Sequence, residues 1–242
     1  LATPRNSTWA LLKPDDPSLE DDDEVRLYLE EINRRLFSAR YAPRANFSTN
    51  ATECYMSLGA FGTGPFFIDD DTGRGLRYRA LHLSEVFIGE DFQGSVDRVH
   101  RKFRLKAYQC EQMFEPDSLP VRITRAIEQK KVMDEFEFVH CVKPNAYFDP
   151  RRADGEGMPF ASYYVNLDEK KIVIERGKQG YGGYRTMPYA VPRYMTGPGE
   201  VYGRSPAMTV LADIKMVNEM SKTVIRAGQR HVEPPYILSD DT

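Results

Sequence analysis

The stretch Gly199-Glu-Val-Tyr-Gly-Arg-Ser-Pro206 marks the place where a glycine- and proline-rich loop becomes a helix. Ser205 is a residue type favoured at the N-cap, and Pro206 suits the first helical position because its missing N–H would have no helical partner there. The pattern predicts a rod that ends near residue 230, about 25 residues or roughly 37 Å long at about 1.5 Å per residue. Its apolar residues recur at helical spacing and are Leu211, Ile214, Val217, Val224 and Ala227.

The composition of the 242-residue chain is that of a globular protein, with 41% hydrophobic and 29% charged residues. These fractions favour a mixed α+β fold over a fibre or a disordered chain. No apolar run approaches the ~18 residues that cross a bilayer, so we expect no membrane partner. The chain begins at Leu1 rather than at methionine, which suggests a part of a longer protein.

Charge is unevenly distributed, although the net charge is only −3. Seven of the ten residues from Asp15 to Glu24 are acidic, whereas the segment Arg98–Lys106 holds five Lys or Arg residues. The acidic run directly precedes a predicted helix, where carboxylates compensate the positive end of the helix dipole. The three cysteines are far apart and lack a metal-binding spacing, so we expect buried free thiols. They are Cys54, Cys110 and Cys141.

Hydrophobic periodicity predicts a helical start followed by a compact antiparallel sheet. Two helices are expected at 25–37 and 47–58, the second ending at Gly59. The period then changes to that of strands, which we expect at 66–68, 76–83, 86–88 and 96–105.

A second β-rich segment follows two further helical stretches at 106–114 and 119–133. Residues 177–183 read as a loop within it because of their four glycines. The sequence thus predicts a β module enclosed by helical segments. Its strands are expected at 136–142, 160–167, 171–175 and 187–195.

The strand at 96–105 alternates between apolar and basic residues. Val99, Phe103 and Leu105 would face a core. Such a basic face either remains solvated at a sheet edge or contacts another subunit or nucleic acid. The residues of the outer face are Arg98, His100, Lys102 and Arg104.

No pattern in the chain supports an enzyme, a cofactor or a metal site. The glycines of 59–64 lack the order and the following Lys of a phosphate-binding loop. The carboxylates of 69–71 lack the glutamate at the twelfth position of a calcium loop. His140 and Cys141 are adjacent on a predicted strand, so they would point to opposite faces and form no dyad.

The block from Gly199 to Pro206, preceded by Pro192-Arg193 and followed by Leu211-Ala-Asp-Ile214, resembles the head-to-tail connector (portal) proteins of short-tailed bacteriophages. Trp9-Ala-Leu-Leu12 and the helix at 25–37 fall in the order found in that family. The likeness extends over the whole chain and corresponds to a middle portion of a longer family member. The motif residues, which we interpret as architectural, are Gly199, Glu200, Tyr202, Gly203, Arg204, Ser205 and Pro206.

The resemblance implies an α+β, portal-like subunit of a ring, typically of twelve copies, at one capsid vertex of the virion. Double-stranded DNA would pass through the ring during packaging by a terminase motor and during ejection. The capsid and tail adaptor proteins would be further partners, and assembly would take place in the host cytoplasm. The implied regions are a helical and β-rich wing portion at 1–105, a first stem helix region at 106–135, a β-rich clip at 136–204, and a second stem helix with the start of the tunnel loop at 205–242.

A polar stripe on the second stem helix is the candidate DNA-facing surface. The alternative is that its three last cations simply complement the negative end of the helix dipole. A different hypothesis for the whole chain is a stand-alone nucleic-acid-binding module that uses Arg98–Lys106. The stripe consists of Lys215, Glu219, Lys222, Arg226 and Arg230.

Overall fold

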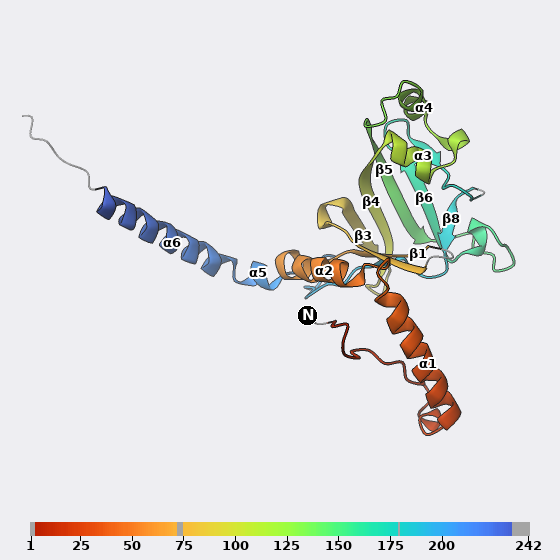
Figure 1. The fold of residues 1–242 in the computed structure, drawn as a ribbon, viewed down its shortest axis with the longest axis horizontal. Coiled ribbons are helices and arrows are strands. Elements are labelled where there is room, and N and C mark those ends of the chain that lie inside the picture. Colours follow the sequence, from red (N-terminus) through yellow and green to blue (C-terminus); the bar gives the residue numbers. More distant parts are fainter. Residues whose placement is uncertain (1–2, 72–74, 179, 234–242) are drawn as a thin grey trace, which may run out of the picture.

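The computed structural model describes residues 3–71, 75–178 and 180–233 (Figure 1). It contains 38% helix and 26% strand, so the α+β prediction is confirmed. A β-rich body occupies the middle, and two helices, α1 (Asp23–Arg40) and α6 (Leu211–Val232), project from it in different directions. The expected start of the tunnel loop, residues 234–242, lies outside the described residues.

A three-stranded antiparallel sheet forms the base of the body. Its strand order is β2-β1-β9, so a short strand from late in the chain closes the sheet beside β1. Helix α2 (Phe47–Phe61) contacts β2, and Cys54 packs with Phe66 and Tyr78 in the core below it. The strands are β1 (Phe66–Asp71), β2 (Gly75–Ala80) and β9 (Tyr189–Ala190).

A six-stranded antiparallel sheet forms the upper body. Its order is β3-β4-β5-β6-β7, with β8 pairing with the β6 edge next to β7. Several strands differ from the predicted bounds, since only two residues of 187–195 form a strand and 182–184 form one within the expected loop. The strands are β3 (Val86–Glu90), β4 (Val96–Lys106), β5 (Glu135–Pro144), β6 (Phe160–Asn166), β7 (Lys171–Val173) and β8 (Gly182–Tyr184).

The β-rich segment expected at 136–204 does not form a sheet of its own, because β5 pairs with β4. The two strands are paired from Val99 opposite Val142 to Lys106 opposite Glu135. One sheet therefore includes strands from both sides of the boundaries placed at 105 and 135. The reason is that the chain leaves β4, forms two short helices and returns as β5 alongside β4. The assignment of these segments to wing, stem and clip stays a prediction.

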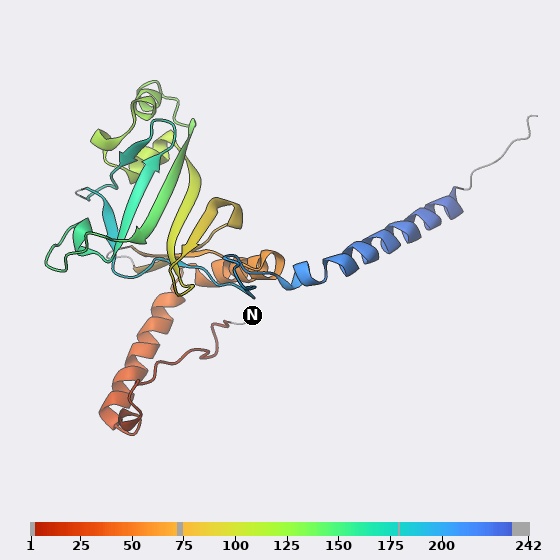
Figure 2. The same cartoon turned by 180° about the vertical axis from the view of Figure 1, so that it is seen from behind.

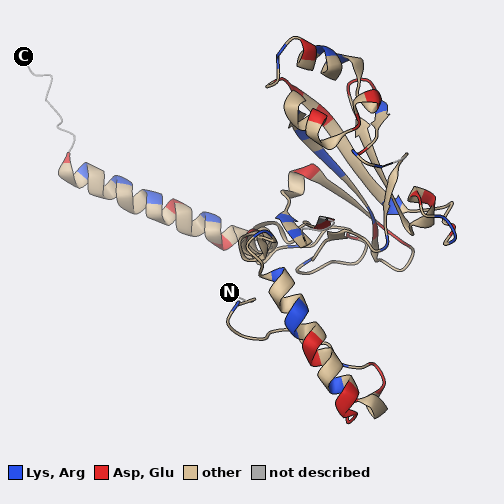
Figure 3. Cartoon of the chain, turned by 45° about the vertical axis from the view of Figure 1, so that its right-hand side comes forward, with Lys and Arg blue, Asp and Glu red and all other residues tan. Residues whose placement is uncertain are grey.

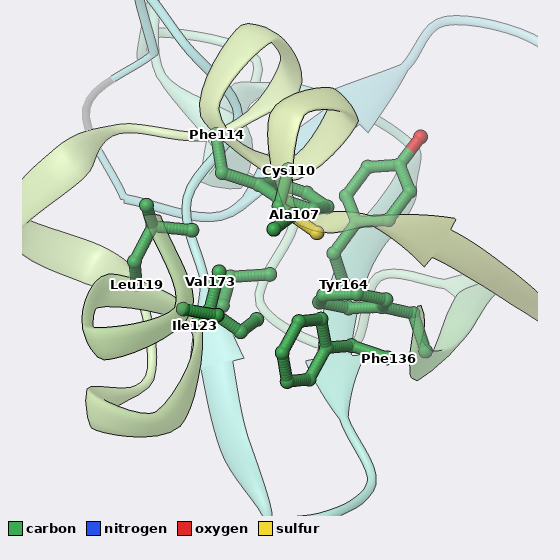
Figure 4. Packing of buried hydrophobic residues seen from close by; sticks show 10 residues of the cluster. Ala107, Cys110, Phe114, Leu119, Ile123, Phe136, Tyr164 and Val173 are labelled. Atoms are coloured by element: carbon green, nitrogen blue, oxygen red, sulfur yellow. The ribbon is translucent and has the colours of Figure 1, made fainter. Parts of the chain in front are cut away.

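Residues 106–135 do not contain one long helix. They form α3 (Ala107–Met113) and α4 (Val121–Glu128), which pack together at one end of the large sheet. Pro116 and Pro120 interrupt the helical run because proline lacks a backbone donor and restricts the preceding residue. The helices cover a core of fully buried side chains (Figure 4), of which the largest are Phe114, Phe138 and Ile123.

The three cysteines are free thiols, as predicted. Cys54 and Cys110 are buried as expected, whereas the expectation is wrong for Cys141, which is only half-buried. Burial raises the pKa of the Cys110 thiol to about 12, so this group stays protonated and unreactive at neutral pH. Among the described residues, no helix is both long and apolar enough to cross a membrane.

His140 lies in the middle of the core, 2% exposed, and bridges the two sheets. Its Nδ1 is 2.6 Å from the Tyr189 hydroxyl of β9, and its Nε2 is 2.9 Å from the Ser162 hydroxyl of β6. Its ring stacks on Tyr164 with centroids 4.2 Å apart. Burial lowers the pKa of His140 to about 3, so the imidazole is a neutral structural link rather than a catalytic base.

We expect the stability of the protein to fall as the pH decreases from about 6.5 towards 3. The unfolded histidine takes up a proton in this range and the folded one does not, so His140 costs up to about 1.4 kcal/mol of unfolding free energy per pH unit. Urea unfolding at pH 7, 6 and 5 measures the slope. His140→Gln should remove this part of the slope; equal slopes for the wild type and this variant would contradict the assignment.

Candidate functional site: the junction at the base of a projecting helix

The motif loop 199–206 crosses the connection between α2 and β1. The Gly203 N–H donates a 2.8 Å hydrogen bond to Thr63 Oγ1, across 140 residues of sequence. On the other side of the same connection, the Tyr194 N–H donates to the Gly62 carbonyl at 2.8 Å, and the Gly64 N–H donates to the Pro192 carbonyl at 3.1 Å. These bonds fix the chain that leads to α6 against the base of the body.

Two glycines allow this crossing. A Cβ on Gly203 would lie 2.2 Å from the Gly62 carbonyl oxygen, and a Cβ on Gly62 would lie 2.4 Å from the Gly203 carbonyl oxygen. Gly62 also has a φ of 77° and is the left-handed residue that ends α2. The prediction that α2 ends at Gly59 is therefore wrong. The helix continues because Gly59 is tolerated in its interior, whereas the tertiary contact requires Gly62.

Arg193 links the same loop to the large sheet. Its guanidinium pairs with the Glu90 carboxylate and donates to the Val201 carbonyl at 3.0 Å and the Gly94 carbonyl at 3.1 Å. Both side chains of the ion pair are about one fifth exposed. The sequence placed Arg193 beside the motif but assigned it no role, because Glu90 and Gly94 lie about 100 residues earlier in the chain.

The remaining motif residues shape the loop itself. Arg204 Nε donates to Glu200 at 2.8 Å, and this bond holds the pKa of the Glu200 carboxyl below its usual value. The Tyr202 hydroxyl accepts the Ile88 N–H of β3 at 3.2 Å. Gly199 adopts a φ of 76°, which turns the loop. Each of these contacts holds the loop in its shape, and the architectural role of the motif stays a prediction.

The predicted helix start is present, but the helix is not one straight rod. Ser205 is 1% exposed, and its Oγ accepts the Met208 N–H at 2.9 Å, ahead of α5 (Pro206–Thr209). Val210 then leaves helical geometry at φ −101° and ψ 18°, and α6 begins at Leu211. The short turn α5 packs against α2, so it is part of the junction, and the projecting part starts only after Val210.

Every residue of α6 is exposed, and the helix extends away from the body in both views (Figures 1 and 2). Its apolar residues nevertheless gather on one side. An amphipathic helix gains most of its stability by burying such a stripe against a partner. The stripe consists of Ile214, Val217, Val224 and Ile225, which are 40–71% exposed.

The predicted polar residues share the opposite side of α6 (Figure 3). They are spaced by three or four positions, so the helix aligns them in one row. Lys222 pairs with Glu219 at 3.2 Å. The row carries four cations and one carboxylate, namely Lys215, Glu219, Lys222, Arg226 and Arg230.

The basic face of β4 has the predicted orientation but is largely neutralised. Lys102 and Arg104 both lie 2.9 Å from the Glu137 carboxylate of the neighbouring strand, and Arg98 lies 2.8 Å from Asp97. The bonds from Lys102 and Arg104 hold the pKa of Glu137 below its usual value. His100 is exposed on the same face. This surface therefore offers few unpaired cations to a phosphate backbone.

The described part of the chain holds no cluster of three or more His, Cys, Asp or Glu side chains able to bind a metal ion. The strand register places His140 opposite Tyr164 and Cys141 opposite Tyr163, on opposite faces of β5. The junction and α6 thus remain as the candidate functional parts.

The sequence profile of the family described as bacteriophage head to tail connecting protein matches residues 1–242. The chain belongs to this connector family. It is 25% identical over 232 residues to the probable portal protein of Bordetella phage BPP-1, and to the same extent to the portal protein of Salmonella phage epsilon15. Each alignment covers 95% of this chain and 40% of the relative, so the chain spans about two fifths of the length of these curated relatives.

We expect Gly203→Ala to destabilise the connector chain by several kcal/mol, because the new Cβ overlaps the Gly62 carbonyl and the backbones must separate. Gly59→Ala is the matched control. Nothing lies within 4 Å of its added Cβ, so it should stabilise α2 by about 0.5–1 kcal/mol. Urea unfolding measures the change in unfolding free energy for each variant. Equal changes for the two substitutions would contradict the close contact between the backbones at Gly62 and Gly203.

Proposed function

We propose that this chain is a middle portion of a phage portal subunit, which forms a ring with other copies at one capsid vertex and lets double-stranded DNA pass in and out. The family match and the two relatives named as portal proteins support the proposal. The observation that carries it is the exposed, amphipathic α6 on its fixed junction.

Copies arranged around an axis would cover the apolar side of α6. Each apolar side chain that becomes fully buried contributes about 1.5–3 kcal/mol, so four such residues per copy favour close packing of neighbouring helices. The apolar stripe of each α6 would then contact the helices of neighbouring copies, and the polar row would face the axis of the ring. The junction supports this arrangement because α5 is held against α2, which fixes the point from which α6 projects.

The polar row suits weak contact with moving DNA. Four cations and one carboxylate per copy attract phosphates without reading base sequence. A ring multiplies each charge by the number of copies, and the interspersed Glu219 limits the attraction. A lining of this kind would hold the duplex in the channel and let it slide.

Other parts of the proposal rest on the family resemblance. They are the typical number of twelve copies, docking of the terminase motor and tail adaptor proteins, contact with the capsid, and assembly in the host cytoplasm. The wing at 1–105, stem at 106–135 and 205–242, and clip at 136–204 belong to the same set. The continuous sheet through β4 and β5 would couple the wing and the clip mechanically.

We expect Val217→Asp/Val224→Asp in the full-length protein to abolish rings in negative-stain electron micrographs and in sedimentation velocity. The reason is that charges would replace apolar side chains at the contact between helices. The subunit itself should unfold at the wild-type temperature, because both residues are exposed within the monomer. Lys222→Gln/Arg226→Gln, on the polar row of the same helix, should still form rings. Rings of the aspartate variant would contradict the proposed packing.

A stand-alone nucleic-acid-binding module is the alternative function. The alignment of Arg98, Lys102 and Arg104 on one face favours it, and their pairing with Asp97 and Glu137 opposes it. We expect the 242-residue chain to show no binding of a 30-base-pair duplex at 150 mM salt in fluorescence anisotropy. Micromolar binding that decreases with salt and is lost in Arg98→Ala/Lys102→Ala would support the alternative instead.

A further inference from the structure

A cavity of about 760 Å³ opens between the two sheets and α3. Its inner wall is aromatic and includes Phe67, Tyr184 and Tyr189. The arginine rim, defined as Arg77 and Arg79 on β2 and Arg101 on β4, shares this lining with two carboxylates, Asp69 and Glu175. Neither the junction nor the exposed helix α6 uses this cavity.

The arginines of the rim are incompletely neutralised. Arg101 pairs with Glu85 at 3.1 Å and lies over the Phe103 ring. Arg77 lies directly opposite Asp69 in the β1–β2 pairing, and Glu175 of the same lining is already paired with Lys178. Burial, followed by the charges of Arg101 and Arg77, lowers the pKa of Arg79, and the attraction of Asp69 is a smaller effect. A bound carboxylate would relieve this repulsion.

The same chain carries the opposite charge at the far end of α1. The acidic tip, defined as residues 15–24, is exposed throughout and holds seven carboxylates (Figure 3). Asp16 and Asp22 accept backbone hydrogen bonds, and Asp23 pairs with Arg26 at 2.7 Å. The helix dipole needs only the carboxylates of the first turn. The excess is therefore unexplained by the fold.

Three carboxylates of the tip are left without a side-chain partner among the described residues. Asp15, Asp21 and Glu24 form no side-chain hydrogen bond or ion pair within the part of the chain that the structure describes. The tip lies at the end of α1 that points away from the body, whereas the other end of α1 joins the sheets (Figure 1). It cannot reach the cavity of its own copy.

We propose that the acidic tip of one copy binds the arginine rim of the cavity in a neighbouring copy. Arginine and carboxylate form paired, charge-assisted hydrogen bonds that suit a partly enclosed site. Each copy would donate one tip and receive another, which is the head-to-tail type of contact that closes into a ring. The inference rests on the proposed ring, and it adds the surface that joins neighbouring bodies independently of α6.

A charge-swap experiment on the full-length protein tests this contact. Arg77→Glu/Arg79→Glu and Asp21→Lys/Glu24→Lys should each raise the concentration needed for half-assembly at least tenfold in mass photometry. The protein that combines all four substitutions should recover most of the loss, because opposite charges again meet. Arg122→Glu/Arg125→Glu, on the exposed face of α4, reverses the same number of charges and should assemble like the wild type.

The outcomes separate this inference from the proposed function. Wild-type rings together with normal assembly of the Arg77→Glu/Arg79→Glu protein would overturn the inference and leave the portal proposal intact. Loss of assembly without recovery in the combined protein would overturn it as well, since the rim would then bind another occupant. A mixture of Asp21→Cys and Arg79→Cys copies gives a second readout, because the contact predicts a disulfide between the two proteins that neither forms by itself.

Discussion

The structure depends on two backbones that cross at Gly62 and Gly203. No side chain fits between them, since a Cβ on either glycine would overlap the carbonyl oxygen of the other. The buried Thr63 hydroxyl bonds across the crossing, and Arg193 extends the contact to Glu90 on the large sheet. This small region therefore connects both sheets to α5. The position and direction of α6 relative to the body therefore depend on this crossing.

The body gives the junction a rigid support. His140 joins the two sheets through Tyr189 and Ser162, and the long pairing of β4 with β5 makes the upper sheet continuous. A helix exposed along its whole length cannot be held by its own packing. Its direction must come from its base, and the base is buried and hydrogen-bonded on several sides. This combination of a rigid base and an uncovered helix is what a subunit of a larger assembly requires.

The charges of the chain also differ between the body and the exposed projecting parts. Cations on β4 are paired with carboxylates of β5 inside the fold, whereas the polar row of α6 and the acidic tip each gather an excess of one sign of charge on exposed surface. Such an excess acts on molecules outside the monomer. In the proposed function, these separate surfaces would contact copies of the chain and DNA.

The sequence by itself determined the features that depend on neighbours along the chain. Ser205 and Pro206 cap a helix, α6 is amphipathic, and β4 alternates, because each pattern repeats every two to four residues. The family motif from Gly199 to Pro206 was also recognised from the sequence. Only the tertiary structure decided that β4 pairs with β5, that α2 ends at Gly62, and that Val210 separates α5 from α6. Those outcomes depend on contacts across tens to 140 residues, which local periodicity does not encode.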